Sequence, residues 1–69
     1  MIFLKNKIKE LRSANSISQE ELASAMGVSR QTIISLENGK YNPSILLAYK
    51  IAKYFHLSIE DLFCFEEEL

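Results

Sequence analysis

The stretch from Val28 to Pro43, VSRQTIISLENGKYNP, gathers polar side chains that can hydrogen bond to the edges of bases. An Arg side chain can donate two hydrogen bonds to guanine, and a Gln side chain can bond N6 and N7 of adenine, each pair worth about 1–3 kcal/mol of discrimination. Arg at the start of a helix opposes the helix dipole, so a binding role explains it better than helix stability does. The candidate base-contacting residues are Arg30, Gln31, Thr32 and Ser35.

Charge is divided between two regions of the chain, although the formal net charge is only −1. Residues 1–53 hold all eight Lys and Arg residues and four acidic residues, a balance of +4. Residues 54–69 hold five acidic residues and no Lys or Arg, a balance of −5. This division predicts one surface that attracts a polyanion and another kept away from it, unless the acidic end is simply a solvated tail.

The length of 69 residues indicates one small domain, residues 1–69. One Cys and one His exclude an intramolecular disulfide and a four-ligand zinc site, so we expect no metal, no other cofactor and no small-molecule ligand. The apolar runs are too short to cross a membrane, and the N-terminus lacks the order of a signal peptide. We therefore expect a cytoplasmic protein with no membrane partner.

Capping residues predict five helices. A Ser before each of the last four helices can accept an N–H of the first turn, and Glu21 completes a capping box with the first of these serines. Glycines after the second and third helices can adopt the left-handed conformation that ends a helix. The predicted helices cover residues 5–15, 19–26, 30–38, 45–55 and 59–63, with N-caps Ser18, Ser29, Ser44 and Ser58 and end glycines Gly27 and Gly39.

The two chain ends, MIFL and FCF, are apolar and rich in residues that favour β-strands. We expect short strands at residues 1–4 and 63–67 that pair into a small antiparallel sheet at one edge of the helices. Their apolar side chains either complete the core of the monomer or form the interface of a C2 homodimer, and we expect the dimer because so small a core hides them poorly. The residues concerned are Ile2, Leu4, Phe63 and Phe65.

The second and third predicted helices, joined by a tight turn at Gly27, form a helix-turn-helix over about residues 19–38. In this arrangement the second of the two helices lies in the major groove with its N-terminal residues at base edges, and the first spans the backbone. Ile33 and Leu36 then face the core, opposite the base-contacting residues. Lys40, directly after the helix, can reach a phosphate.

The segments QEELASAMGVSRQTIISLENGKYNPS, IAKYF and SIEDLF resemble the Xre/Cro phage-repressor-type helix-turn-helix family over about residues 8–62. The short length and apolar ends resemble the compact homodimeric regulators of the cytolysin-operon repressor type. The resemblance implies an all-α, five-helix DNA-binding domain, with the terminal sheet at the dimer edge.

The resemblance also implies roles for individual residues. Positions that read bases in the family correspond to Arg30, Gln31 and Ser35, with Thr32 beside them. A salt bridge between Arg12 and Glu37 would tie the first helix to the third. Contacts to the DNA backbone are expected from Gln19, Ser29, Asn38, Lys40, Tyr41 and Asn42, where Tyr41 either bonds a phosphate or packs over its loop.

Two positions depart from the family pattern. His56 stands where a glycine is common, and it either accepts a left-handed conformation at a helix end or senses pH. Ile34 is apolar where polar residues are usual, and it either touches a thymine methyl group or packs against the neighbouring helix.

These observations favour a transcriptional regulator, specifically a repressor, that binds a near-palindromic site in double-stranded DNA as a homodimer. The alternative is an antitoxin or antirepressor-type protein-binding module on the same fold. An enzyme is not expected, since the sequence offers no Ser/His/Asp spacing, no paired carboxylates in a predicted pocket and no phosphate-binding glycine loop.

Overall fold

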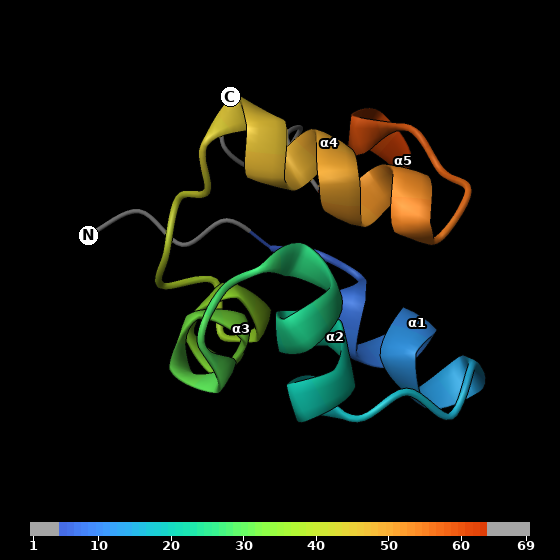
Figure 1. The fold of residues 1–69 in the computed structure, drawn as a ribbon. Helices are drawn as coiled ribbons and strands as arrows, with labels where there is room; N and C mark the ends of the chain where they lie inside the picture. The colour runs from blue at the N-terminus through green and yellow to red at the C-terminus, as the bar shows by residue number, and fades with distance from the viewer. Residues whose placement is uncertain (1–4, 64–69) are drawn as a thin grey trace.

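Serine hydroxyls fix where four of the five helices begin. In the computed structural model, which describes residues 5–63, the Ser before each of these helices accepts the N–H of the residue three positions later. The predicted capping box of Ser18 and Glu21 is present, and Ser58 forms another with Asp61. The helices are α1 (Ile8–Ala14), α2 (Gln19–Met26), α3 (Arg30–Glu37), α4 (Ile45–Tyr54) and α5 (Ile59–Leu62) (Figure 1).

Each of the first four helices is followed, one or two residues after its last residue, by a residue with positive φ. The N–H after that residue donates to the carbonyl five residues earlier, at 2.8–3.0 Å, which is the Schellman arrangement. The predicted left-handed residues Gly27, Gly39 and His56 are confirmed, with φ of 72°, 73° and 60°. Ser16, with φ of 56°, was not predicted because Ser is uncommon in this conformation.

The first helix is shorter than predicted, because residues 6 and 7 form hydrogen bonds that differ from those of a helix. The Asn6 side chain accepts the N–H of Ile8 at 3.1 Å, and Lys7 N–H donates to the carbonyl of Leu62 at 2.9 Å. Helical turns therefore start only at Ile8. Ala14, the last residue of α1, is exposed.

The predicted terminal sheet is not supported within residues 5–63, where the two ends meet in one isolated antiparallel bridge between Asn6 and Phe63. Residues 1–4 and 64–67, which make up nearly all of both predicted strands, lie outside the described residues. The fold shown by the described chain is therefore all-α.

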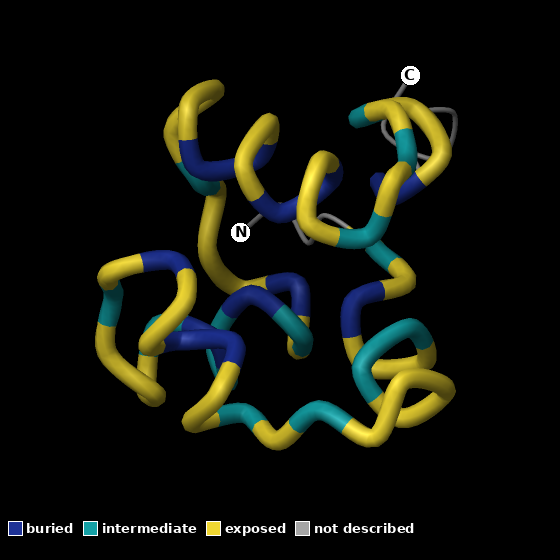
Figure 2. The backbone as a smooth tube through the Cα atoms, turned by 45° about the vertical axis from the view of Figure 1, so that its right-hand side comes forward, coloured by how far each residue is buried: buried dark blue, intermediate teal, exposed yellow. Residues whose placement is uncertain are grey.

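The core lies between α4, with α5 beside it, and the three helices below (Figure 1). In Figure 2 the buried residues of α4 face this body and the exposed ones face outward. Ile33 and Leu36 of α3 are fully buried, as predicted, and each such side chain contributes about 1.5–3 kcal/mol relative to exposure. This burial fixes which face of α3 is presented to solvent.

Candidate nucleic-acid interface

The first turn of α3 is an exposed polar surface. Arg30 and Gln31 open the helix and are exposed, while Thr32 and Ser35 are half-buried. Among residues 5–63, the side chains of Arg30 and Gln31 form no hydrogen bond or ion pair within the protein. Their donors and acceptors are thus available to a ligand at this end of the helix.

Thr32 is held against the cap of the same helix. Its N–H donates to the Ser29 hydroxyl at 3.2 Å, and the two hydroxyl oxygens lie 2.9 Å apart. A hydroxyl has one donor and two acceptor lone pairs, so this pair keeps hydrogen-bonding capacity for an outside group. Ser29 is therefore a cap, as predicted, and the pair stays a candidate for DNA contact.

The loop after α3 uses some of its backbone donors internally. The N–H groups of Asn38, Gly39 and Lys40 donate to carbonyls of α3 at 3.0–3.1 Å. Within the described part of the chain, the N–H groups of Tyr41 and Asn42 have no hydrogen-bond partner. The backbone donors that this loop can offer to a phosphate thus lie later in the loop, beside the exposed side chains of Asn38, Lys40, Tyr41 and Asn42.

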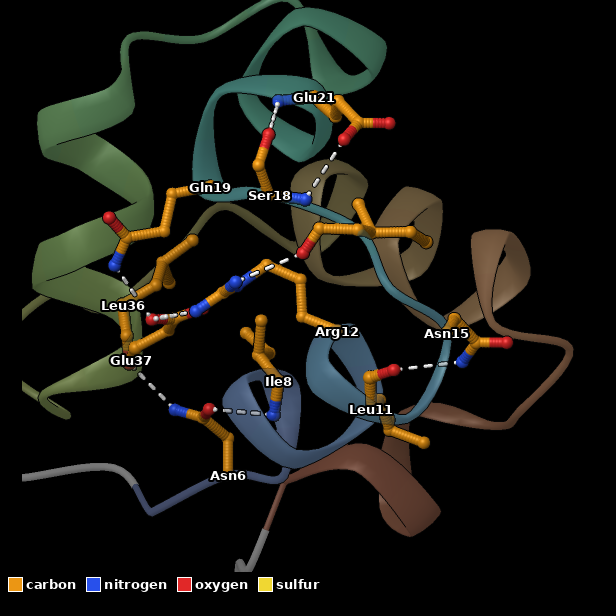
Figure 3. Close-up of polar contacts among 11 residues, drawn as sticks. Asn6, Ile8, Leu11, Arg12, Asn15, Ser18, Gln19, Glu21, Leu36 and Glu37 are labelled. Atoms are coloured by element: carbon orange, nitrogen blue, oxygen red, sulfur yellow. Dashed lines mark hydrogen bonds and ion pairs between the residues drawn. The ribbon is translucent and has the colours of Figure 1, made fainter.

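A half-buried network ties α3 to α1 and α2 (Figure 3). Arg12 binds the Glu37 carboxylate in two places, Nε to Oε2 at 2.6 Å and Nη2 to Oε1 at 3.2 Å, so the two residues make the expected contact. Arg12 also donates to the Ile17 carbonyl at 3.0 Å. The hydrogen bond from Arg12 to Glu37 raises the pKa of the Arg12 guanidinium above its ordinary value, because this bond outweighs the opposing effect of partial desolvation.

Gln19, expected at the DNA backbone, joins the same network. Its Nε2 donates to Glu37 Oε1 at 3.1 Å (Figure 3). A Gln amide carries two N–H donors, so this bond occupies one and leaves the other for a phosphate. The geometry therefore positions the Gln19 amide at the start of α2.

Two further braces were not predicted. Asn6 donates to the carbonyl of Leu36, near the end of α3, at 2.7 Å (Figure 3). Lys50 of α4 donates to the carbonyl of Met26, the last residue of α2, at 3.3 Å. The positive charge of Lys50 also interacts favourably with the dipole of α2, because the C-terminal end of a helix is partially negative. Both helices of the helix-turn-helix are thus held at their C-terminal ends by side chains distant in sequence.

Other predicted residues are placed as follows. Ile34 is half-buried, so it is accessible beside the exposed face of α3. Tyr41 is 42% exposed. Phe63, a candidate for the dimer interface, is 2% exposed and belongs to the core of the monomer, while Ile2, Leu4 and Phe65 lie outside the described residues.

No group of three or more His, Cys, Asp or Glu side chains within residues 5–63 is arranged to hold a metal ion. Over the same range, none of the helices has the length and apolarity needed to span a bilayer.

The fold and the braced pair α2 and α3 define a helix-turn-helix protein. A family model described as helix-turn-helix, HTH_3, matches residues 8–62, and the chain belongs to this family, which confirms the Xre/Cro-type resemblance. The finer resemblance to the cytolysin-operon repressor type stays a prediction. The chain is therefore a DNA-binding regulator of transcription and not an enzyme.

Three similar proteins illustrate the family. Over 65 residues the chain is 54% identical to MJ0272, an uncharacterized HTH-type transcriptional regulator of Methanocaldococcus jannaschii, covering 94% of this chain and 98% of that protein. It is 33% identical over 57 residues to the cryptic phage CTXphi transcriptional repressor RstR of Vibrio cholerae, covering 83% and 51%. The solved structure of the biofilm regulator SinR in complex with DNA aligns with a TM-score of 0.68 and 31% identity, covering 78% of this chain and 87% of that chain.

Proposed function

We propose that the protein is a sequence-specific repressor that binds a near-palindromic operator as a homodimer, with α3 in the major groove. The relative RstR is named a transcriptional repressor, and SinR was solved in complex with DNA, which supports the proposal by analogy. A DNA-binding domain can repress transcription simply by covering the site that it binds. The expected cytoplasmic location belongs to the same proposal.

The observation that carries this proposal is the exposed first turn of α3. Arg30 and Gln31 have bidentate side chains, stand at the end of a helix that the motif presents to base edges, and have no partner within residues 5–63. Arg30 also opposes the dipole of its own helix, which a purely structural role does not explain. Thr32 and Ser35 extend the same surface.

Contacts to phosphates would set the register of α3 in the groove without reading sequence. We propose that they come from the ends of the motif: the second amide N–H of Gln19, the N–H groups of Tyr41 and Asn42, and the Lys40 ammonium. Ser29 and the side chains of Asn38, Tyr41 and Asn42 complete the proposed set. The Glu37 network would hold Gln19 ready before DNA arrives, which limits the entropy lost on binding.

The competing function is a protein-binding module that uses the same fold. Exposed apolar residues on α4 favour contact with a protein. In that case the polar first turn of α3 would have no ligand.

Fluorescence anisotropy with a random-sequence DNA duplex separates the two functions. The regulator should bind the duplex weakly at low salt, and the logarithm of its affinity should fall linearly with the logarithm of the salt concentration, because bound phosphates release counterions. Lys40→Ala should make that slope shallower by about 1 for each bound protomer, because each copy of the variant neutralises one phosphate fewer. Absence of binding to any duplex at low salt would overturn the proposal in favour of the protein-binding module.

A further inference from the structure

Ile34 is an apolar side chain within the otherwise polar surface of α3. Its neighbours one turn away on either side, Arg30 and Asn38, are both exposed. Successive residues of a helix are turned by roughly 100°, so Ile34 points roughly 130° away from the midpoint between the fully buried Ile33 and Leu36. Ile34 therefore belongs to the side of α3 that carries the proposed base contacts.

Neither the core nor the stability of the helix explains an isoleucine at this position. Ile34 is half-buried, and within residues 5–63 it is not one of the half-buried apolar side chains that pack against the core, which are Leu11, Ile17, Val28, Phe55 and Ile59. Isoleucine is also a weaker helix former than alanine, leucine, lysine or glutamate. An apolar side chain that contributes little to the core or to its own helix points to a contact outside the chain.

We propose that Ile34 is a specificity-determining residue that contacts the C5-methyl group of a thymine in the major groove. This role rests on the proposed function and adds to it a contact that no hydrogen bond can supply. Thymine presents its methyl group at the major-groove edge, where apolar side chains can contact it. Isoleucine is branched at Cβ and strongly prefers one χ1 rotamer in a helix, so its methyl groups lose little freedom on binding.

The position of Ile34 along α3 locates this thymine relative to the base that Arg30 would contact. The two residues are four apart in the helix, which corresponds to a rise of about 6 Å. Neighbouring base pairs of a duplex are about 3.4 Å apart. The thymine should therefore lie within about two base pairs of the position at which Arg30→Ala loses its preference.

Replacement of single thymines by deoxyuridine tests the proposal, because deoxyuridine lacks only the C5-methyl group. The starting duplex is the sequence that the wild type selects from a random pool, and fluorescence anisotropy measures the affinity for it and for each substituted duplex. At one thymine of the half-site the wild type should bind the deoxyuridine duplex about fourfold more weakly, roughly the value of one buried methyl-sized group. Ile34→Ala should bind both duplexes equally at that position, and Ile34→Val, which stays apolar and branched, should keep the preference.

Ile59→Ala is the matched control, since Ile59 is a half-buried isoleucine that packs against the core from α5. It should keep the fourfold preference for thymine, and in urea denaturation it should lose more stability than Ile34→Ala. The same methyl group also occurs on 5-methylcytosine, so a comparison of 5-methylcytosine with cytosine at this position tests the second possible source. A 5-methylcytosine duplex that binds the wild type more tightly than the thymine duplex would overturn the assignment to thymine.

The outcomes also separate this role of Ile34 from the proposed function. Equal wild-type affinity for thymine and deoxyuridine at every position would overturn the role of Ile34 alone, because the protein would still select a sequence. A preference for thymine that Ile34→Ala retains at every position, or a selected half-site without thymine, would overturn it in the same way. A wild type that binds no duplex at low salt would overturn both. Far-ultraviolet circular dichroism should be unchanged in all three variants, so that lost discrimination is not lost folding.

Discussion

Glu37 is the residue through which the DNA-facing helix is joined to the rest of the motif. Its carboxylate receives hydrogen bonds from Arg12 of α1 and Gln19 of α2, while Glu37 itself ends α3. The side chains of Arg12 and Glu37 are only 13% and 5% exposed, so their charges depend on each other for solvation. Loss of either partner leaves a charge in a poorly solvated site.

Removing one charge should therefore destabilise the protein more than removing both. We expect Arg12→Met to lower the free energy of unfolding by about 2–4 kcal/mol, because it leaves the Glu37 carboxylate without its ion pair. The double variant Arg12→Met, Glu37→Leu should be more stable than Arg12→Met alone. Urea denaturation of the wild type, both single variants and the double variant measures this coupling. Strictly additive losses would show that the ion pair contributes no coupling energy.

At the scale of helices, left-handed residues end each of the first four helices. Two of these residues are Gly27 and Gly39, and two, Ser16 and His56, carry a Cβ atom that opposes this conformation. The same hydrogen-bonded helix end therefore forms even where the left-handed residue is Ser or His and not glycine. His56 is exposed, which fits a helix-ending role.

The conformation of His56 gives a prediction for stability. His56→Gly should raise the free energy of unfolding by about 0.5–1 kcal/mol, because relief of left-handed strain exceeds the added entropy of glycine in the unfolded chain. His56→Ala keeps the Cβ atom and removes the imidazole, and it should not stabilise. Thermal unfolding at pH 5.5 and pH 8 compares the variants. Destabilisation by both substitutions, at one pH more than the other, would instead indicate a role for the imidazole as a pH sensor.

Local elements were predictable from the sequence, and long-range contacts mostly were not. The Ser18 cap and the Gly27 end depend on hydrogen bonds within a few residues, so their residue types predict them. Asn6 and Lys50 bond to carbonyls 30 and 24 residues away, and nothing in their immediate sequence indicates those partners. Arg12 and Glu37 were predicted only through the family resemblance. The exposure of Ile45, Leu46 and Tyr49 was not predicted, because it depends on which side of α4 packs on the core.

At the scale of the whole molecule, the basic residues proposed to contact DNA and the acidic residues of α5 lie on different elements. The first turn of α3 and the loop after it offer Arg30 and Lys40 at one side, while the acidic residues of α5 lie beside α4. The proposed homodimer would direct two α3 helices to one DNA duplex. Net charge of the chain, at −1, does not describe this arrangement.

Selection of bound duplexes from a random pool tests the central claim, that α3 reads DNA sequence, most directly. The wild type should enrich two half-sites related by two-fold symmetry, with centres about 10–10.5 base pairs apart. Arg30→Ala should lose preference at one base pair of each half-site, whereas the control Lys40→Ala should weaken binding and keep the same sequence. An unenriched pool, or an Arg30→Ala sequence identical to that of the wild type, would contradict the account.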